Sequence, residues 1–297
     1  MMPEDGNPER GDITQSGSDG GFFRSETGIR VLSGVALVAI ALGLTYQGGA
    51  VFALLWFVAG AALFFEWTRM AAVDRRVPTL IAATLALLAY VLSRVTGMPA
   101  IVLTAIAVSG GVLVVLIPTT MRDRVWAGFG YITAFVVVAV PIAVRFDPLL
   151  GAAGIIWIFA VVWGTDIAGY FTGRKIGGPK LWPSVSPRKT WSGFIGGLVA
   201  GTLAGTITGA VARTFGMVLP FDLLSLAVLS AFASVLGQIG DLTESAMKRH
   251  FHVKDSSHVI PGHGGVMDRL DAFAAVCLLV GVLLIWAFFF GFPGRVL

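Results

Sequence analysis

The chain has 297 residues, of which 56% are hydrophobic and only 13% are charged, and its formal net charge is +4. A soluble domain carries roughly 25% charged residues, so this composition excludes an ordinary soluble protein and predicts an all-α polytopic membrane protein. The basic excess does not indicate nucleic-acid binding, because the Lys and Arg residues lie in short loops where membrane topology and anionic lipid account for them.

In chain order, residues 1–28 come first, and they are polar and rich in Gly and Ser. They lack the basic and apolar regions of a signal peptide, so we expect a disordered cytoplasmic tail. Residues 29–297 are predicted to form a single membrane-embedded catalytic domain with nine apolar segments, each near the roughly 20 residues that a span needs. The nine predicted spans are Ile29–Tyr46, Ala50–Trp67, Val77–Val95, Pro99–Ile117, Val125–Val144, Pro148–Tyr170, Gly193–Val211, Asp222–Gly240 and Leu270–Phe290.

Two details of these spans predict packing. The seventh span is rich in Gly, Ala and Thr, which indicates close contact with other helices rather than exposure to lipid. The single cysteine, Cys277, lies inside the ninth apolar segment, where we expect it to be a small packing residue.

The distribution of basic residues predicts the topology. With nine spans, one side of the membrane receives the N-terminus and the even-numbered loops, which hold most of the 21 Lys and Arg residues. This asymmetry predicts a cytoplasmic N-terminus. It also places the two longest loops between spans, 171–192 and 241–269, on the cytoplasmic side. Only four basic residues fall on the other side: Arg94, Arg145, Arg213 and Arg295.

Three acidic residues flank the last of these loops. Asp241 follows the eighth span, and Asp268 and Asp271 open the ninth at a spacing that puts them on one helix face. Acids at a helix N-terminus have an ordinary alternative role, because they complement the macrodipole and cap free N–H groups. Carboxylates from two helices suit Mg²⁺, which takes one or two of them and completes its shell with water and phosphate oxygens. We therefore predict a metal site formed by Asp241, Asp268 and Asp271.

The same loop carries cations that suit phosphate. Lys248, Arg249 and Lys254 follow Asp241 closely, and membrane topology with lipid headgroup contact is the simpler explanation of their charge. Topology and headgroup contact do not explain why Ser245 and the Gly-rich segment 261–265 accompany these cations. The backbone N–H groups of such a segment can approach an anion closely. We therefore favour phosphate binding.

All four histidines of the chain, His250, His252, His258 and His263, fall in this loop. A zinc site needs three or four ligands in a tetrahedral array, and no cysteine is available here, so zinc is disfavoured. His263, inside Gly262-His-Gly-Gly265, is the histidine that we expect to contact phosphate.

The other long loop supplies a second group of polar residues. Asp166 lies within or at the end of the sixth span, where an unpaired acid is costly. Ser186, Lys189 and Thr190 precede the seventh span, whose N-terminus favours an anion. An ordinary basic re-entrant loop is the alternative interpretation.

Ser245–Asp271 resembles the signature of the phosphatidate cytidylyltransferases, the CDP-diacylglycerol synthases. That signature runs Ser-x-apolar-Lys-Arg, then Lys-Asp, then Pro or Gly before x-His-Gly-Gly, and finally Asp-Arg-x-Asp. The second family segment, Ser-Pro-x-Lys-Thr-x-Glu-Gly, is similar to Ser186–Gly193. Ser192 stands where the family usually has Glu, which leaves the role of that carboxylate open.

The resemblance implies transfer of CMP from CTP to phosphatidic acid, giving CDP-diacylglycerol and pyrophosphate. It implies Mg²⁺ on Asp241 and Asp268 with support from Asp271, and leaves a second, monovalent cation such as K⁺ open. It also implies a bacterial cytoplasmic membrane with the site facing the cytoplasm, while a homodimer stays an alternative to a monomer. The expected catalytic residues are Lys248, Arg249, Lys254, His263 and Asp268, and the expected substrate-binding residues are Ser186, Lys189, Thr190, Ser245 and Asp166.

Two other functions compete. One is a different CTP- or CDP-dependent membrane lipid enzyme, although the Asp-Gly-x-x-Ala-Arg pattern of CDP-alcohol phosphotransferases is absent. The other is a polytopic transporter, which more often places its ionisable residues near the bilayer midplane between internal repeats.

Overall fold

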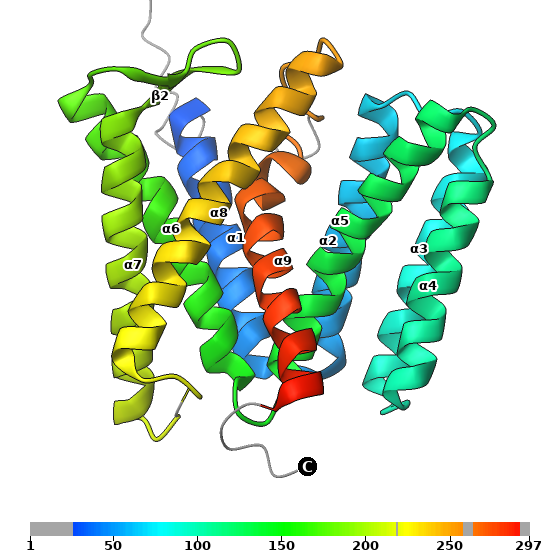
Figure 1. The fold of residues 1–297 in the computed structure, drawn as a ribbon, viewed down its shortest axis with the longest axis horizontal. Helices are drawn as coiled ribbons and strands as arrows, with labels where there is room; N and C mark the ends of the chain where they lie inside the picture. Colours follow the sequence, from blue (N-terminus) through cyan, green and yellow to red (C-terminus); the bar gives the residue numbers. More distant parts are fainter. Residues whose placement is uncertain (1–25, 218, 258–263, 292–297) are drawn as a thin grey trace, which may run out of the picture.

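The computed structural model describes residues 26–217, 219–257 and 264–291, which form a bundle of nine helices with one two-stranded sheet (Figure 1). The helices are α1 (Glu26–Gln47), α2 (Gly49–Met70), α3 (Arg76–Val95), α4 (Ala100–Leu116), α5 (Met121–Phe146), α6 (Gly151–Ile176), α7 (Trp191–Thr214), α8 (Leu223–His250) and α9 (Met267–Phe290). The strands β1 (Lys180–Trp182) and β2 (Ser186–Thr190) connect α6 to α7.

Each of the nine predicted spans coincides with a helix of the described chain. Seven of these helices are long and apolar enough to cross a membrane, while α4 and the apolar part of α1, Leu32–Gln47, are shorter. The chain is therefore an integral membrane protein by these seven helices, and nine spans with a cytoplasmic N-terminus stay a prediction. The predicted tail lies almost wholly outside the described residues, except that Glu26–Gly28 already belong to α1.

The structure is nearly all-α, as predicted, and the exception is a β-hairpin in the loop between α6 and α7. Gly177 and Gly178 end α6 with φ values of +66° and +95°, a conformation that only glycine adopts without strain. The chain then pairs Lys180 with Thr190 and Trp182 with Ser186 in antiparallel register. Figure 1 shows that this hairpin and the C-terminal end of α8 lie at the same end of the bundle.

The prediction for the eighth span ended too early. Helix α8 continues ten residues beyond Gly240, to His250, so the segment 241–250 is helical rather than part of a loop. Helical hydrogen bonds need no apolar side chains, and the basic residues of the last turn complement the macrodipole. Asp241, Glu244 and Lys248 therefore share one face of a helix.

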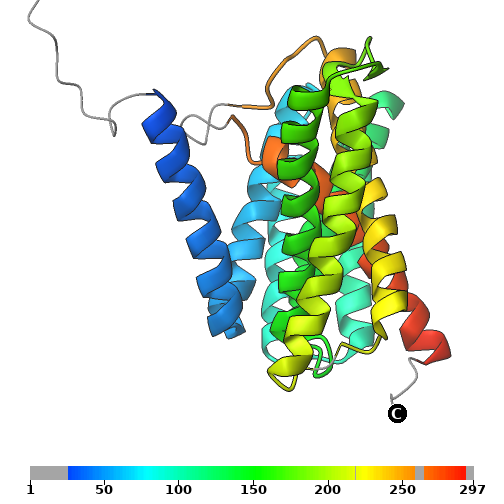
Figure 2. The same ribbon diagram turned by 90° about the vertical axis from the view of Figure 1, so that its left-hand side faces the viewer.

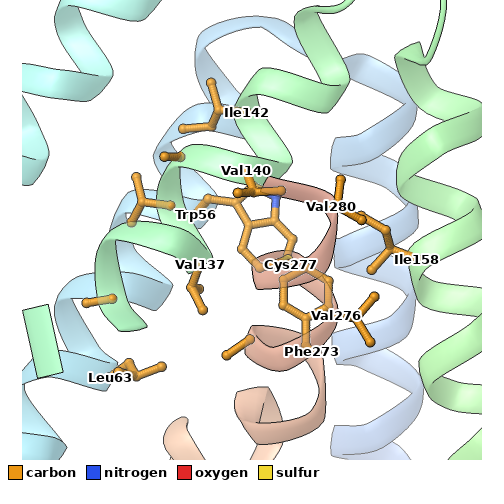
Figure 3. Packing of buried hydrophobic residues seen from close by; sticks show 14 of the residues in the cluster. Trp56, Leu63, Val137, Val140, Ile142, Ile158, Phe273, Val276, Cys277 and Val280 are labelled. Atoms are coloured by element: carbon orange, nitrogen blue, oxygen red, sulfur yellow. The ribbon is translucent and has the colours of Figure 1, made fainter. Parts of the chain in front are cut away.

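The core holds α2, α5, α6 and α9 together. Trp56 of α2 stacks on Phe273 of α9, with ring centroids 4.6 Å apart and planes 4° from parallel (Figure 3). Val137 of α5 and Ile158 of α6 are fully buried beside them. Cys277 is also fully buried, which confirms its predicted role as a packing residue.

Helix α1 is joined to this core mainly at one end. Figure 2 shows it leaning away from the other helices, and Val35 and Ile40 are 62% and 50% exposed. At its C-terminal end, Arg145 of α5 donates hydrogen bonds to the carbonyl oxygens of Thr45 (2.8 Å) and Tyr46 (3.2 Å). Arg145 thus satisfies carbonyls that a helix end leaves free.

A column of buried glycines on α7 faces α6 and α8, which confirms the expected close packing on this face, whereas the opposite face, with Val199 and Leu203, is exposed. A Cβ atom at Gly205 would lie 2.3 Å from Ser230 Oγ and 2.8 Å from Trp157 Nε1. Those two side chains already share a hydrogen bond of 2.9 Å between α6 and α8. The column consists of Gly193, Gly197, Gly201, Gly205 and Gly209.

Replacing Gly205 by Ala is therefore expected to lower the thermal unfolding temperature in detergent, because the added methyl group overlaps the Ser230–Trp157 pair. Overpacking of this kind costs about 1–3 kcal/mol. The matched control is Gly43→Ala in α1, where a Cβ atom meets nothing within 4 Å. Equal unfolding temperatures for the two variants would contradict the close packing of α7.

Asp74 connects two turns that lie at the same end of the bundle as the hairpin. Its carboxylate accepts hydrogen bonds from the backbone N–H and the hydroxyl of Thr119, which joins the α2–α3 turn to the α4–α5 turn. The Thr119 hydroxyl is the main cause that holds the pKa of Asp74 below its usual value. A lowered carboxyl pKa stabilises the fold above the unfolded pKa, and this contribution is lost as pH falls through the folded pKa.

Thr119→Val is expected to raise the pKa of Asp74 toward its usual value and to weaken the dependence of stability on acid pH. Thermal unfolding measured between pH 3 and pH 7 should show a smaller loss on acidification for the variant than for the parent chain. Thr104→Val is the control, because the Thr104 hydroxyl donates only to the Ala100 carbonyl of its own helix. Parallel pH profiles for all three chains would contradict the role of Thr119.

Candidate active site

Two groups of charged side chains lie at the end of the bundle where α6, α8, α9 and the hairpin meet. We call Asp166, Asp241 and Asp271 the acidic cluster, and Glu244, Lys248 and Asp268 the Lys248 cluster. Together they hold most of the residues that the sequence singled out.

The acidic cluster brings carboxylates from three helices together. The charge of Asp241 acts on both Asp166 and Asp271, which also repel each other. Lys189 of β2 pairs with this cluster, since its Nζ lies 2.5 Å from Asp241 Oδ2, and the charge of Arg269 also acts on Asp166. The side chains of this pair are 27% and 33% exposed, so the cluster is accessible rather than sealed.

Close helix packing makes this convergence possible. A Cβ atom at Gly240 of α8 would lie 2.8 Å from the backbone oxygen of Asp271 on α9, so only glycine permits the contact. A Cβ atom at Gly193 of α7 would lie 2.8 Å from the backbone oxygen of Gly169 on α6. These glycines thus allow α8 to pack against α9 and the start of α7 to pack against α6.

The Lys248 cluster is more buried. Lys248 Nζ lies 2.6 Å from Glu244 Oε2 and 2.7 Å from Asp268 Oδ1, and all three side chains are at most 15% exposed. Asp268 Oδ2 accepts hydrogen bonds from the Ser256 hydroxyl (2.9 Å), the Ser256 N–H (3.2 Å) and the Gly265 N–H (2.9 Å). Both oxygens of Asp268 are therefore engaged by protein donors.

The three predicted metal ligands divide between the two clusters. Asp241 and Asp271 come together and are joined by Asp166, whereas Asp268 pairs with Lys248. Within the described residues, no group of three or more His, Cys, Asp or Glu side chains is placed so that it could hold a metal ion. The predicted metal site therefore stays a prediction.

The hairpin residues have mainly structural contacts. Thr190 caps α7, since its Oγ1 accepts a hydrogen bond of 3.1 Å from the Gly193 N–H. Ser192, at the position where Glu was expected, donates a 2.5 Å hydrogen bond to the Gly177 carbonyl and contacts Thr190. Ser186 opens β2 and is partly buried. Lys189 is thus the hairpin residue that reaches the acidic cluster.

The remaining predicted residues border the Lys248 cluster. Arg249 and Lys254 are exposed, and Ser245 is partly buried on α8. His263 lies outside the described residues, so its predicted contact with phosphate stays a prediction.

Two buried acids were missed from the sequence. Glu244 lies four residues before Lys248, a helical spacing that could have indicated their pairing. Glu66 is the one acidic residue of the second predicted span, where an ionisable side chain is a functional hypothesis by default. Its side chain is 1% exposed and contacts the start of α9.

Comparison with known proteins identifies the family of this chain. The model of the cytidylyltransferase family matches residues 28–288. A phosphatidate cytidylyltransferase of Brucella suis biovar 1 is 38% identical over 263 residues, which cover 84% of this chain and 90% of that protein. A phosphatidate cytidylyltransferase of Bacillus subtilis is 33% identical over 256 residues, covering 83% and 93%. The chain that carries the acidic and Lys248 clusters therefore belongs to the cytidylyltransferase family.

Proposed function

We propose that this chain is a phosphatidate cytidylyltransferase, which transfers CMP from CTP to phosphatidic acid and releases pyrophosphate. The observation that carries the proposal is the acidic cluster with Lys189 beside it, in a chain that matches the cytidylyltransferase family over residues 28–288. Relatives named for this activity are similar over most of their length, which supports the choice of substrates.

The reaction joins two phosphate groups. A phosphate oxygen of phosphatidic acid attacks the α-phosphorus of CTP, and a new P–O bond forms. The bond between the α-phosphorus and the oxygen that bridges to the β-phosphate breaks, and pyrophosphate leaves with that electron pair. No general base is needed to form the nucleophile, because a phosphate monoester is already ionised near neutral pH. The protein must position two polyanions and offset their repulsion.

The basic residues around the clusters can offset the repulsion between the two negatively charged substrates. Lys189 stands next to the N-terminus of α7, where free N–H groups and the helix dipole favour a phosphate. Arg249 and Lys254 are exposed at the end of α8 and in the following segment, where they can meet the phosphate of a lipid at the membrane surface. Lys248 holds Asp268 in place and is the least accessible of these cations.

We assign Mg²⁺ to the acidic cluster, with Asp241 and Asp271 as ligands and Asp166 as a further carboxylate. When bound, a divalent ion would neutralise phosphate charge and polarise the P–O bonds. Asp268 was also predicted as a ligand, but its contacts favour a role in holding Lys248 and Ser256. We further propose that the site faces the cytoplasm of a bacterial cell, where CTP is found, with the helices in the cytoplasmic membrane.

A product assay tests the function. Purified protein in detergent is incubated with CTP labelled in the cytosine ring and with phosphatidic acid, with and without Mg²⁺. Labelled CDP-diacylglycerol and one equivalent of pyrophosphate, formed only with the metal, are expected. Release of labelled CDP or CMP would indicate another CTP-dependent lipid enzyme, and no turnover with either substrate would favour a transporter.

A further inference from the structure

Glu66 binds the chain segment that precedes the last helix. Its carboxylate Oε1 accepts hydrogen bonds from the Ser257 hydroxyl (2.5 Å) and the Val266 N–H (3.0 Å). Its Oε2 accepts from the Ser256 hydroxyl (3.1 Å) and the Met267 N–H (2.8 Å). One side chain of α2 thus serves four donors at both described ends of the α8–α9 loop.

Two of these donors are the free N–H groups of a helix start. Val266 occupies the N-cap position of α9 and provides no side-chain cap. Glu66 replaces that cap from another helix, and its negative charge suits the positive end of the α9 dipole. The other two donors, Ser256 and Ser257, belong to the segment that leaves α8, so Glu66 holds the loop closed at its base.

Gly265 shows how tightly this contact is built. A Cβ atom at Gly265 would lie 1.9 Å from Ser256 Oγ and 2.6 Å from Glu66 Oε2. The sequence suggested that the Gly-rich backbone receives a phosphate. At Gly265 the anions that approach are instead carboxylates of the protein, since its N–H donates to Asp268 and its Cα faces Glu66.

Glu66 also reaches the Lys248 cluster through one hydroxyl. Ser256 Oγ lies 3.1 Å from Glu66 Oε2 and 2.9 Å from Asp268 Oδ2, so it links the two carboxylates. Asp268 in turn binds Lys248. A displacement of Glu66 would therefore move Ser256, the start of α9 and the orientation of Asp268 together.

We propose that Glu66 is a positioning residue for cytidylyl transfer, which acts through Ser256 and the α9 N-terminus on Asp268 and Lys248. Glu66 is 1% exposed, so it acts through the residues that it binds. Its effect is to hold the charged ends of α8 and α9 in the arrangement that the reaction uses. The proposal rests on the proposed function for its effect on turnover, while the anchoring of the loop is independent of it.

The test uses Glu66→Gln in the full-length protein. Gln keeps the shape of Glu but has one acceptor oxygen instead of two. Its NH₂ group would face a backbone N–H, and two donors cannot form a hydrogen bond with each other. Thr68→Val is the matched control, because Thr68 is also fully buried on α2 but its hydroxyl forms hydrogen bonds only with Phe65 and Arg76. We expect Glu66→Gln to lower kcat about 10- to 100-fold, as loss of an orienting contact around a site does, with KM for CTP within about twofold of the parent chain. Thr68→Val should keep the kcat and the KM for CTP of the parent chain.

Two further readouts separate positioning from folding. Ser256→Ala removes only the bridge to Asp268, so it should lower kcat as well, and the double variant should lose less than the product of the two single effects. Trypsin cleavage after the exposed Lys254 should become about tenfold faster in Glu66→Gln, because a lost cap opens the loop.

Full kcat in a folded Glu66→Gln variant would overturn the proposal. If that variant does not fold, full kcat in Ser256→Ala would overturn it equally. A parent chain that makes no CDP-diacylglycerol would refute the proposed function, and the trypsin rates would then still decide whether Glu66 anchors the loop. Equal cleavage rates for Glu66→Gln and Thr68→Val would show that it does not.

Discussion

Replacing Asp241 by Asn is expected to lower turnover about 10²- to 10³-fold, the range seen when one group that stabilises transition-state charge is removed. Asp241 is the centre of the acidic cluster, since its charge acts on Asp166 and Asp271 and it pairs with Lys189 at 2.5 Å. Asn keeps the size of the side chain and removes its charge. The helix should therefore keep its packing while the cluster loses affinity for a divalent ion.

The decisive measurement for this variant is a Mg²⁺ titration of CDP-diacylglycerol formation. Asp241→Asn should need more Mg²⁺ for half-maximal rate and should stay below the parent rate at saturation. Thr243→Ala is the matched control in the same turn of α8, because the Thr243 hydroxyl is exposed and donates only to the Ile239 carbonyl. Near-normal turnover of Asp241→Asn at low Mg²⁺ would refute the assignment of the metal to the acidic cluster.

Lys248→Met is expected to destabilise the protein by about 3–5 kcal/mol, because removing one partner of a buried ion pair leaves uncompensated charge. Lys248 Nζ lies 2.6 Å from Glu244 and 2.7 Å from Asp268, and the three side chains are nearly excluded from solvent. Thermal unfolding in detergent measures the loss. The exposed Lys175 provides the control, since Lys175→Met should change stability by less than about 0.5 kcal/mol.

A second substitution tests the cause of that loss. Adding Glu244→Gln to Lys248→Met should recover part of the stability, because it removes one of the two buried carboxyl groups that lose their cation. The other, Asp268, still has its hydrogen bonds from Ser256 and Gly265. Additive losses in the double variant would mean that the side chains contribute by packing and that their charges are not coupled.

The sequence was most informative where physical constraints are local. Twenty apolar residues in a row predict a membrane helix, and all nine predicted spans coincide with helices of the described chain. The positions of Asp241, Lys189 and Asp166 near ends of spans predicted a shared site, and the structure brings these three together. Helix boundaries were less certain, because polar residues such as those of 241–250 can extend a helix beyond the apolar run.

Contacts between distant segments could not be derived in this way. Asp268 and Asp271 share a helix face, yet they belong to different clusters, because Lys248 and Ser256 draw Asp268 to one side. Thr190 was read as a substrate ligand, but its hydroxyl is used by the cap of α7. Glu66 bonds to residues 190 to 201 positions away, which no local pattern predicts.

This separation in sequence determines when the Glu66 contacts can form during synthesis of the chain. At a synthesis rate of about 5–20 residues per second, the partners of Glu66 leave the ribosome about 10 to 40 s after α2 does. Until then, the carboxylate near the end of α2 must be hydrated at the membrane surface, since burial without partners is costly. Binding of the two ends of the α8–α9 loop to Glu66 is thus a late step, in which one acid loses its water and the last helix is joined to the second.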